Sequence, residues 1–186
     1  MAAFVGSDNR NAGYVCGEDL VERKPDGGQV VIVENLNVNS VCERITGFEE
    51  AVSKGAFEVV SGIQTGNDVS GLKQQVAQVL AQNPDLMRSC AEMIRWQNRC
   101  GRQLQKPDRK RFMYTVWMVL RHQKKHWWSI QADDGNRAQS PINLGKKAVK
   151  IANAVLNGED YEKETYEETF FINRDNVEMY GTDGWQ

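Results

Sequence analysis

The six residues QVVIVE at 29–34 constrain the fold of this chain more than any other stretch. They are mostly apolar and β-branched, which is typical of a strand whose two faces are both covered. The turn sequence PDGG precedes them, and helical apolar patterns lie on both sides along the chain. A strand of this kind needs helices above and below its sheet, so the sequence predicts an α/β protein.

Two helices are predicted next to this strand. The first covers about 11–24 and follows a short apolar strand at 3–6. The second starts at Ser40, where Glu43 three residues later predicts a capping box in which each side chain satisfies a free backbone N–H. Gly55 is expected to close it. Its apolar residues recur at helical spacing and predict one face turned toward the sheet: Val41, Ile45, Phe48 and Val52.

The alternation of strands and helices continues beyond Gly55. A strand is predicted at 57–61, followed by a helix that Asp68 caps and the sequence NPD at 83–85 stops. The buried face of this helix is expected to consist of Val69, Leu72, Val76, Val79 and Leu80. Together these elements predict a Rossmann-like, mostly parallel sheet flanked by helices.

The end of the chain adds one more helix and a strand. Ser140 followed by Pro141 predicts a helix start, and Gly158 predicts the end of that helix. A strand is predicted at 169–173. Four residues of the helix are expected to face inward: Ala148, Ile151, Ala152 and Val155.

The middle of the chain differs in composition from both of its ends. Residues 87–137 contain 12 of the 23 Lys and Arg residues but only four of the 25 Asp and Glu residues. They also contain both histidines and four of the five tryptophans. The flanks, 1–86 and 138–186, are correspondingly acidic. The sequence therefore divides into two regular α/β parts with an atypical basic part between them.

Several kinds of partner are disfavoured by the sequence. The formal net charge is −2, so nucleic acid is not expected as a partner of the whole molecule. No apolar run is long enough to span a membrane. The apolar start of the chain is short and lacks the basic region and cleavage site of a secretion signal.

Catalytic and metal chemistry are disfavoured as well. The four cysteines lie far apart without the spacing of metal ligands, so no metal site is predicted. The sequence contains no nucleophile–base pair, P-loop or GxGxxG motif. We therefore predict no catalytic residue and no cofactor, and we do not expect an enzyme.

Six stretches resemble the sugar-binding proteins of bacterial ABC importers. Near the start they are FVGSDN, GGQVVIVE, NSVCERITGFEEAV and VLAQNPDL, and near the end AQSPINLGKKAVKIANAVLNGE and TFFINRDNV. Their order and spacing resemble the ribose- and galactose-binding type, the type I periplasmic binding proteins. The resemblance implies two Rossmann-like lobes around a cleft, of which only about the second half is expected here.

The resemblance is interrupted in the middle of the chain. Family members follow NPDL with a strand, an Asn-Asp turn, a helix and a strand ending in Val-Asp-Gly, and the translated frame of 87–137 shows none of these. When one base is inserted before the codon of Met87, the codons of 87–94 encode a strand-like stretch with the acidic turn, and those of 114–121 encode an Asp-Gly pair. A one-base slip in the gene or in its sequencing, corrected near Ala138, is therefore our interpretation.

Two other interpretations of 87–137 stay open. The arginines, lysines and tryptophans of 95–128 could form a genuine surface for nucleic acid or an anionic membrane. Their lack of an amphipathic period disfavours this. The segment could also be a solvated loop. Under the frame-slip interpretation we expect it to pack poorly, with Trp117, Trp127 and Trp128 partly exposed.

The resemblance implies the binding of a monosaccharide. Planar groups hold the hydroxyls of a sugar ring, since Arg donates, Asp accepts, and Asn and Gln do both. Arg44 lies where the family carries a pocket arginine, and Gln139 where it carries an amide ligand at the last crossing between lobes. Ser7, Asp8 and Asn9 lie at a hinge strand, where one of them is expected to contact the ligand.

Each of these residues also has a simpler interpretation. Arg44 could be a surface arginine on its helix and Gln139 a plain loop residue, while Asp8 or Asn9 could cap the helix that follows. The loop 35–39 borders the cleft in the family and is a weaker candidate.

The resemblance also implies the partners. They are a monosaccharide ligand and the membrane permease of an ABC importer, with the protein a monomer outside the cytoplasm; without a secretion signal the chain could stay in the cytoplasm. Because a first lobe and the two acidic pairs are missing from this sequence, we expect weak sugar binding or none. The alternative is the effector-binding domain of a lactose-repressor-like regulator, although the tail TFFINRDNVEMYG favours the transport branch.

Overall fold

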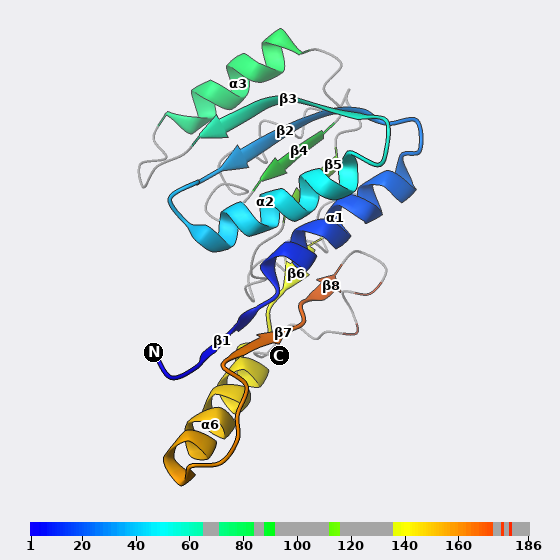
Figure 1. Cartoon of the computed structure of the whole chain (residues 1–186). Helices are drawn as coiled ribbons and strands as arrows, with labels where there is room; N and C mark the ends of the chain where they lie inside the picture. The colour runs from blue at the N-terminus through cyan, green and yellow to red at the C-terminus, as the bar shows by residue number, and fades with distance from the viewer. Residues whose placement is uncertain are drawn as a thin grey trace.

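The computed structural model describes residues 1–64, 71–83, 88–91, 112–115, 136–172, 176 and 179, with the backbone alone at 73, 80, 88–91, 112–115 and 136. The main body is a six-stranded sheet in the order β3-β2-β4-β5-β6-β8 (Figure 1). All neighbouring strands in it are parallel except β6 and β8, which are antiparallel. The predicted α/β fold with a mostly parallel sheet is therefore confirmed.

Helices cover both faces of this sheet. The strands are β2 (Gly28–Glu34), β3 (Phe57–Gln64), β4 (Arg88–Ala91), β5 (Phe112–Thr115), β6 (Asn136–Ala138) and β8 (Phe170–Ile172). The helices are α1 (Asn9–Arg23), α2 (Asn39–Val52) and α3 (Leu72–Gln82). Figure 1 shows α1 and α2 together on one face and α3 on the other. The result is a three-layer arrangement with the sheet in the middle.

Strand β2 is covered on both faces, as its sequence predicts. Val30 and Ile32 face one core cluster, and Val31 and Val33 face a second one. The first cluster also contains residues of α1 and α2: Ala12, Cys16, Leu20, Phe48 and Val52. The second also contains residues of β3 and α3: Ile63, Leu72 and Val76. Because successive side chains of a strand alternate between faces, one apolar run serves two layers.

Helices α1 and α2 pack with their backbones almost in contact. A Cβ atom added at Gly13 would lie 1.8 Å from the carbonyl oxygen of Arg44, and one added at Gly47 would lie 1.9 Å from that of Arg10. No side chain larger than hydrogen fits at either position. The two glycines therefore allow the start of α2 to lie directly against α1, and this approach places Arg44.

A smaller unit projects from the main body. It consists of β1 (Phe4–Ser7) and β7 (Glu164–Glu167), which pair in parallel, and of α6 (Pro141–Asn157) (Figure 1). We call these three elements the projecting unit. The predicted start and end of its helix are confirmed, because the Ser140 side chain accepts a hydrogen bond from the Asn143 N–H and Gly158 closes α6 with a φ of 68°.

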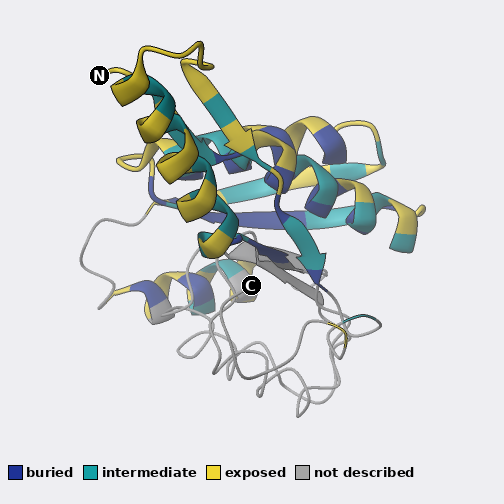
Figure 2. Ribbon diagram, turned by 90° about the horizontal axis from the view of Figure 1, so that it is seen from below, coloured by how far each residue is buried: buried dark blue, intermediate teal, exposed yellow. Residues whose placement is uncertain are grey.

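The prediction that one face of α6 is turned inward is wrong. No residue of α6 is buried (Figure 2). Ala148 and Ala152 are exposed, while Ile151 and Val155 are only half-buried. The physical reason is that α6 covers a two-stranded sheet, which is too narrow to bury a helix face.

Two helix starts also differ from the sequence prediction. Helix α2 begins at Asn39, and its N-cap Val38 makes no side-chain cap, so the capping box between Ser40 and Glu43 is wrong. The Glu43 carboxylate bonds other side chains, which are described below. Helix α3 begins at Leu72, whereas the predicted cap Asp68 lies outside the described residues.

The sheet continues into the atypical segment 87–137. Strand β4 pairs with β2 and β5 pairs with β4, all in parallel. The expectation that the translated frame lacks these strands is therefore wrong for 88–91 and 112–115. The predicted exposure of Trp117, Trp127 and Trp128 lies outside the described residues, and the division of the chain at 87 and 137 stays a prediction.

Candidate ligand-binding site

Three short connections link the projecting unit to the main sheet (Figure 1). They run from β1 to α1 at 7–9, from β6 to α6 at 138–141, and from β7 to β8 at 167–170. The residues that the sequence proposes for the site occupy the first two connections and the start of α2: Ser7, Asp8, Asn9, Gln139 and Arg44. The candidate site is therefore where these connections meet the main body.

Glu167 joins the third connection to the first connection and to helix α6. Its backbone carbonyl accepts a hydrogen bond from the Asp8 N–H at 3.1 Å. Its carboxylate accepts from Asn143 Nδ2 at 3.0 Å and pairs with Lys147 Nζ at 2.6 Å. The hydrogen bond from Lys147 lowers the pKa of Glu167, which keeps this carboxylate charged. Glu167 was not predicted from the sequence, because nothing in the polar stretch ETYE at 164–167 indicates a strand end.

The centre of the candidate site is a hydrogen-bonded pair, Asn9 and Arg44. The Nε and Nη2 atoms of Arg44 both donate to Asn9 Oδ1, at 2.8 and 2.6 Å. Arg44 is 2% exposed, so the interpretation of a surface arginine is wrong. A guanidinium buried to this degree is costly unless polar groups meet its N–H donors. The structure thus joins two predicted site residues that lie 35 positions apart.

Glu43 and Asn39 extend this pair. Glu43 was not among the site residues predicted from the sequence, whereas Asn39 belongs to the loop 35–39, the weaker candidate. Glu43 Oε2 accepts from Asn9 Nδ2 at 3.1 Å, and Glu43 Oε1 accepts from Asn39 Nδ2 at 2.9 Å. The Asn-x-x-x-Glu spacing was a possible signal for the second bond, since residues four apart meet on a helix. The bond to Asn9 had no local signal.

The other predicted residues have different surroundings. Asp8 Oδ1 accepts from the Asn11 N–H at 2.9 Å, so Asp8 caps α1, as one of the two interpretations of this residue holds. Ser7 is buried. Gln139 is half-buried on the second connection, and the hydrogen bonds described for Asn9 and Arg44 do not include it.

Two arginines lie near the same buried thiol. Burial raises the pKa of Cys16 to about 12, and the positive charges of Arg137 and Arg44 act against that rise. Both guanidinium groups are therefore close enough to Cys16 on α1 for their positive charges to favour the thiolate. Arg137 is buried, donates to the Thr169 carbonyl and lies over the Phe171 ring at 5.7 Å. It is a second buried cation beside the connections.

The chemistry of this cluster is that of polar recognition. It offers guanidinium donors together with primary amides that both donate and accept. Among the described residues, no group of His, Cys, Asp and Glu side chains could hold a metal ion. Within the same residues, no helix combines the length and apolar character needed to cross a bilayer.

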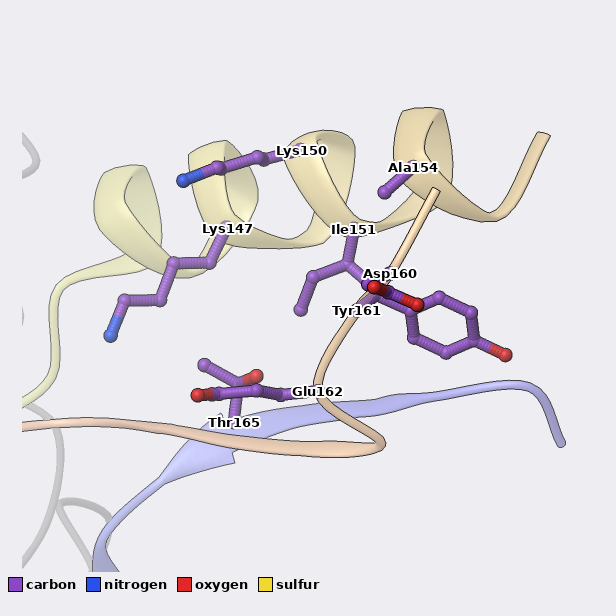
Figure 3. A pocket seen from close by; sticks show the side chains of 8 residues that line it. All are labelled: Lys147, Lys150, Ile151, Ala154, Asp160, Tyr161, Glu162 and Thr165. Atoms are coloured by element: carbon purple, nitrogen blue, oxygen red, sulfur yellow. The ribbon is translucent and has the colours of Figure 1, made fainter. Parts of the chain in front are cut away.

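A groove of about 580 Å³ lies elsewhere, on the projecting unit. Figure 3 shows it between α6 and the segment that leads into β7, with the side chains of Ile151 and Thr165 facing each other across it. Lys147 and Tyr161 also line it. None of the residues proposed from the sequence lines this groove, so it is separate from the cluster around Arg44.

Comparison with known proteins gives consistent matches. Residues 1–160 match the family described as periplasmic binding protein domain. A D-ribose/D-allose-binding protein of Pseudomonas aeruginosa is 32% identical over 85 residues, which are 45% of this chain and 26% of that protein. The chain spans about a quarter of the length of this curated relative.

Solved structures share the fold. A glucose-galactose binding protein from Geobacillus stearothermophilus has a TM-score of 0.81 and 22% identity over 95% of this chain and 64% of its own. A sugar-binding protein of a sugar ABC transporter from Bacillus halodurans has a TM-score of 0.84 and 18% identity over 97% and 67%. Because the family match extends over most of the residues, this chain belongs to the periplasmic binding protein domain family.

Proposed function

We propose that this chain forms the second-lobe part of a monosaccharide-binding site in the substrate-binding component of an ABC sugar importer. The observation that carries the proposal is the Arg44 guanidinium, buried and held by Asn9 beside the connections between the projecting unit and the main body. The relative from Pseudomonas aeruginosa, whose name states ribose and allose binding, supports the same class of ligand.

The roles of the residues follow from their chemistry. Arg44 donates to ring and hydroxyl oxygens, while Asn9, Gln139 and Ser7 donate or accept at neighbouring hydroxyls. Asp8 has a structural part in this proposal, because its carboxylate caps α1. The function is binding and release without chemical conversion of the sugar. The membrane permease of the importer is the proposed macromolecular partner, and the proposed location is outside the cytoplasm.

We also propose that this chain alone binds sugar weakly. It covers 64% of the glucose-galactose binding protein that shares its fold, so a site closed by two lobes is only partly represented. A dissociation constant near 1 mM corresponds to only about −4 kcal/mol. Binding of this order is expected when several polar groups of a site stay unpaired, since each costs about 1–3 kcal/mol.

The test is an NMR titration of the isotope-labelled chain with pentoses and hexoses, including ribose, allose, arabinose, glucose and galactose. At least one sugar is expected to cause saturable shifts of the Arg44 Nε–H and the Asn9 side-chain amide at millimolar concentration. Glycerol serves as the control for unspecific polyol effects. If no sugar causes a saturable shift that glycerol does not, the proposed function is wrong.

A substitution at Arg44 tests whether its guanidinium binds the sugar. Arg44→Lys keeps the charge but removes the planar pair of donors, so the sugar response is expected to vanish. Arg23→Lys is the matched control, because Arg23 pairs with Asp19 on α1 away from the cluster. A micromolar or tighter affinity of the unaltered chain would support sugar binding and contradict the claim that it is weak.

A further inference from the structure

We propose that Glu43 is a positioning residue, which sets the orientation of the Asn9 amide and through it the direction of the Arg44 donors. This inference rests on the proposed function, because it names the residue that aligns the guanidinium of the proposed sugar site. Glu43 itself does not contact the sugar in this proposal.

The two ends of the Asn9 amide meet neighbours of opposite hydrogen-bonding character. On one side, an ionised Glu43 carboxylate can only accept, and it accepts from Asn9 Nδ2 at 3.1 Å. On the other side, the Arg44 guanidinium can only donate, and it donates twice to Asn9 Oδ1. The orientation of an amide follows from the hydrogen bonds that its oxygen and its NH₂ group make. Here one orientation alone satisfies both neighbours.

Glu43 and Arg44 lie next to each other on α2 but point in different directions. Glu43 and Arg44 are consecutive residues, which point about 100° apart around a helix and do not face each other. A group from another element must therefore connect them. Asn9 at the start of α1 is that group, and it comes within reach because Gly13 and Gly47 let the two helices approach.

The carboxylate is itself held in place. Asn39, one turn earlier on α2, donates to the second oxygen of Glu43 at 2.9 Å. Both oxygens of Glu43 are thus engaged, so this side chain has little freedom to rotate away from Asn9. The sequence of contacts runs from Asn39 through Glu43 and Asn9 to Arg44, and the last member is the buried cation.

Glu43→Gln tests this sequence of contacts. The substitution keeps the shape but replaces one acceptor oxygen by a donor, which then opposes the amide NH₂ of Asn9 or of Asn39. If Asn9 turns over to avoid the conflict, its NH₂ faces the Arg44 donors and the guanidinium must move. We expect the dissociation constant for the sugar to rise about tenfold.

The matched control is Glu50→Gln. Glu50 also bridges α2 to α1, but its carboxylate pairs with the exposed Arg10 at 2.8 Å and not with Asn9. The Glu50→Gln variant therefore removes an ion pair between the same two helices and leaves the contacts of the Asn9 amide unchanged. Its sugar affinity is expected to stay within twofold of the unaltered chain.

A rescue separates positioning from loss of structure. Combining Glu43→Gln with Asn9→Asp exchanges the amide and the carboxylate along the contact sequence. The new glutamine then donates to the new carboxylate, which still accepts from Arg44 on its other side. The double variant is expected to recover the Arg44 signal, whereas a role in folding alone predicts no such recovery.

The primary readout needs no sugar. It is the NMR shift and hydrogen exchange of the Arg44 Nε–H, expected to change in Glu43→Gln, to return in the double variant and to stay constant in Glu50→Gln. An unchanged Arg44 signal in Glu43→Gln overturns the proposal, as does an equal change in Glu50→Gln. If the signals behave as expected but no sugar binds the unaltered chain, the positioning stands and the proposed function fails.

Discussion

At the scale of single residues, the structure depends on how a few buried polar groups are satisfied. Asn9 is only half-buried, yet its short amide contacts both a carboxylate and a buried guanidinium. The Asn9 side chain is therefore expected to contribute more to stability than its partial exposure suggests, and it also orients the proposed ligand site.

Asn9→Ala is expected to lower the free energy of unfolding by about 1–3 kcal/mol, because it removes an acceptor from a buried guanidinium. Urea denaturation followed by circular dichroism measures this. Asn11→Ala is the control, since the side chain of Asn11 is exposed on the same helix. Equal midpoints for the two variants would show that the contact with Arg44 contributes nothing to stability.

Cys16 gives a pH dependence whose sign follows from its burial. Its pKa is raised from 9.0 to about 12 in the folded chain, so the folded state keeps a proton that the unfolded state loses. The stabilisation is fully present below about pH 9 and is lost progressively toward about pH 12, at up to about 1.4 kcal/mol per pH unit.

The test compares the unaltered chain with Cys16→Ala between pH 8 and pH 10.5 by urea denaturation. Other groups titrate in this range in both proteins, so only the difference between their slopes counts. The unaltered chain is expected to lose stability more steeply as the pH rises. Parallel slopes would mean that the Cys16 thiol is not sheltered in the folded state.

At the scale of secondary-structure elements, the close contact of α1 and α2 is the decisive feature. A strand such as β2 is specified by its own apolar run, and a helix such as α2 by the spacing of Val41, Phe48 and Val52. How near two helices lie depends instead on small residues that meet across the interface. Gly13 and Gly47 have this role, and the contact from Asn9 to Arg44 depends on it.

Gly47→Ala is therefore expected to destabilise the chain by about 1–3 kcal/mol or more, because its methyl group would overlap the backbone of Arg10. The matched control is Gly145→Ala on α6, where nothing lies within 4 Å of an added Cβ atom. That change is expected to be neutral or slightly stabilising, since Ala favours a helix over Gly by up to about 1 kcal/mol. Thermal denaturation of both variants checks this. Gly47→Ala is expected to lower the melting temperature and Gly145→Ala is not; equal melting temperatures would contradict the prediction.

At the scale of the whole molecule, the projecting unit and the main body differ in how much apolar surface they bury. In the main body, α1 and α2 enclose a core with β2. On α6, Val149 is 71% exposed and Leu156 is 85% exposed. Because α6 buries no residue, we expect the projecting unit to open locally more readily than the main body.

Hydrogen exchange is expected to show this difference. The amides of α6 should exchange much faster than those of β2 and α1, because local opening of α6 exposes little additional apolar surface. Exchange followed by mass spectrometry on peptides from 141–157 and 28–34 measures it. Equal protection in both regions would show that the projecting unit unfolds only together with the main body.

The origin of segment 87–137 is also a question about the whole molecule. The frame-slip interpretation predicts that the nucleotide sequence contains one base too few before codon 87 and a compensating change near codon 138, relative to a gene with the family pattern. Independent sequencing of this region tests it. A clean reading frame with synonymous variation among close strains would contradict it.

The local features were well predicted for physical reasons that lie within a few residues. The two-sided burial of β2, the helix start at Ser140 and the helix end at Gly158 depend on side-chain periodicity and on caps, which neighbouring residues determine. The predicted capping box at Glu43 was wrong because a distant residue, and not a neighbouring one, determines where this carboxylate bonds. Asn9 competes for that carboxylate from 34 positions away.

The sequence by itself determined the α/β class, the apolar faces of the helices in the main body and the residue types available for binding. Tertiary structure alone decided that Arg44 is buried against Asn9, that Glu43 faces this pair, and that α6 lies away from the main sheet with no buried face. The physical reason is the distance along the chain over which each effect acts. Periodicity and caps are local, whereas the environment of a charged side chain depends on which distant elements pack against it.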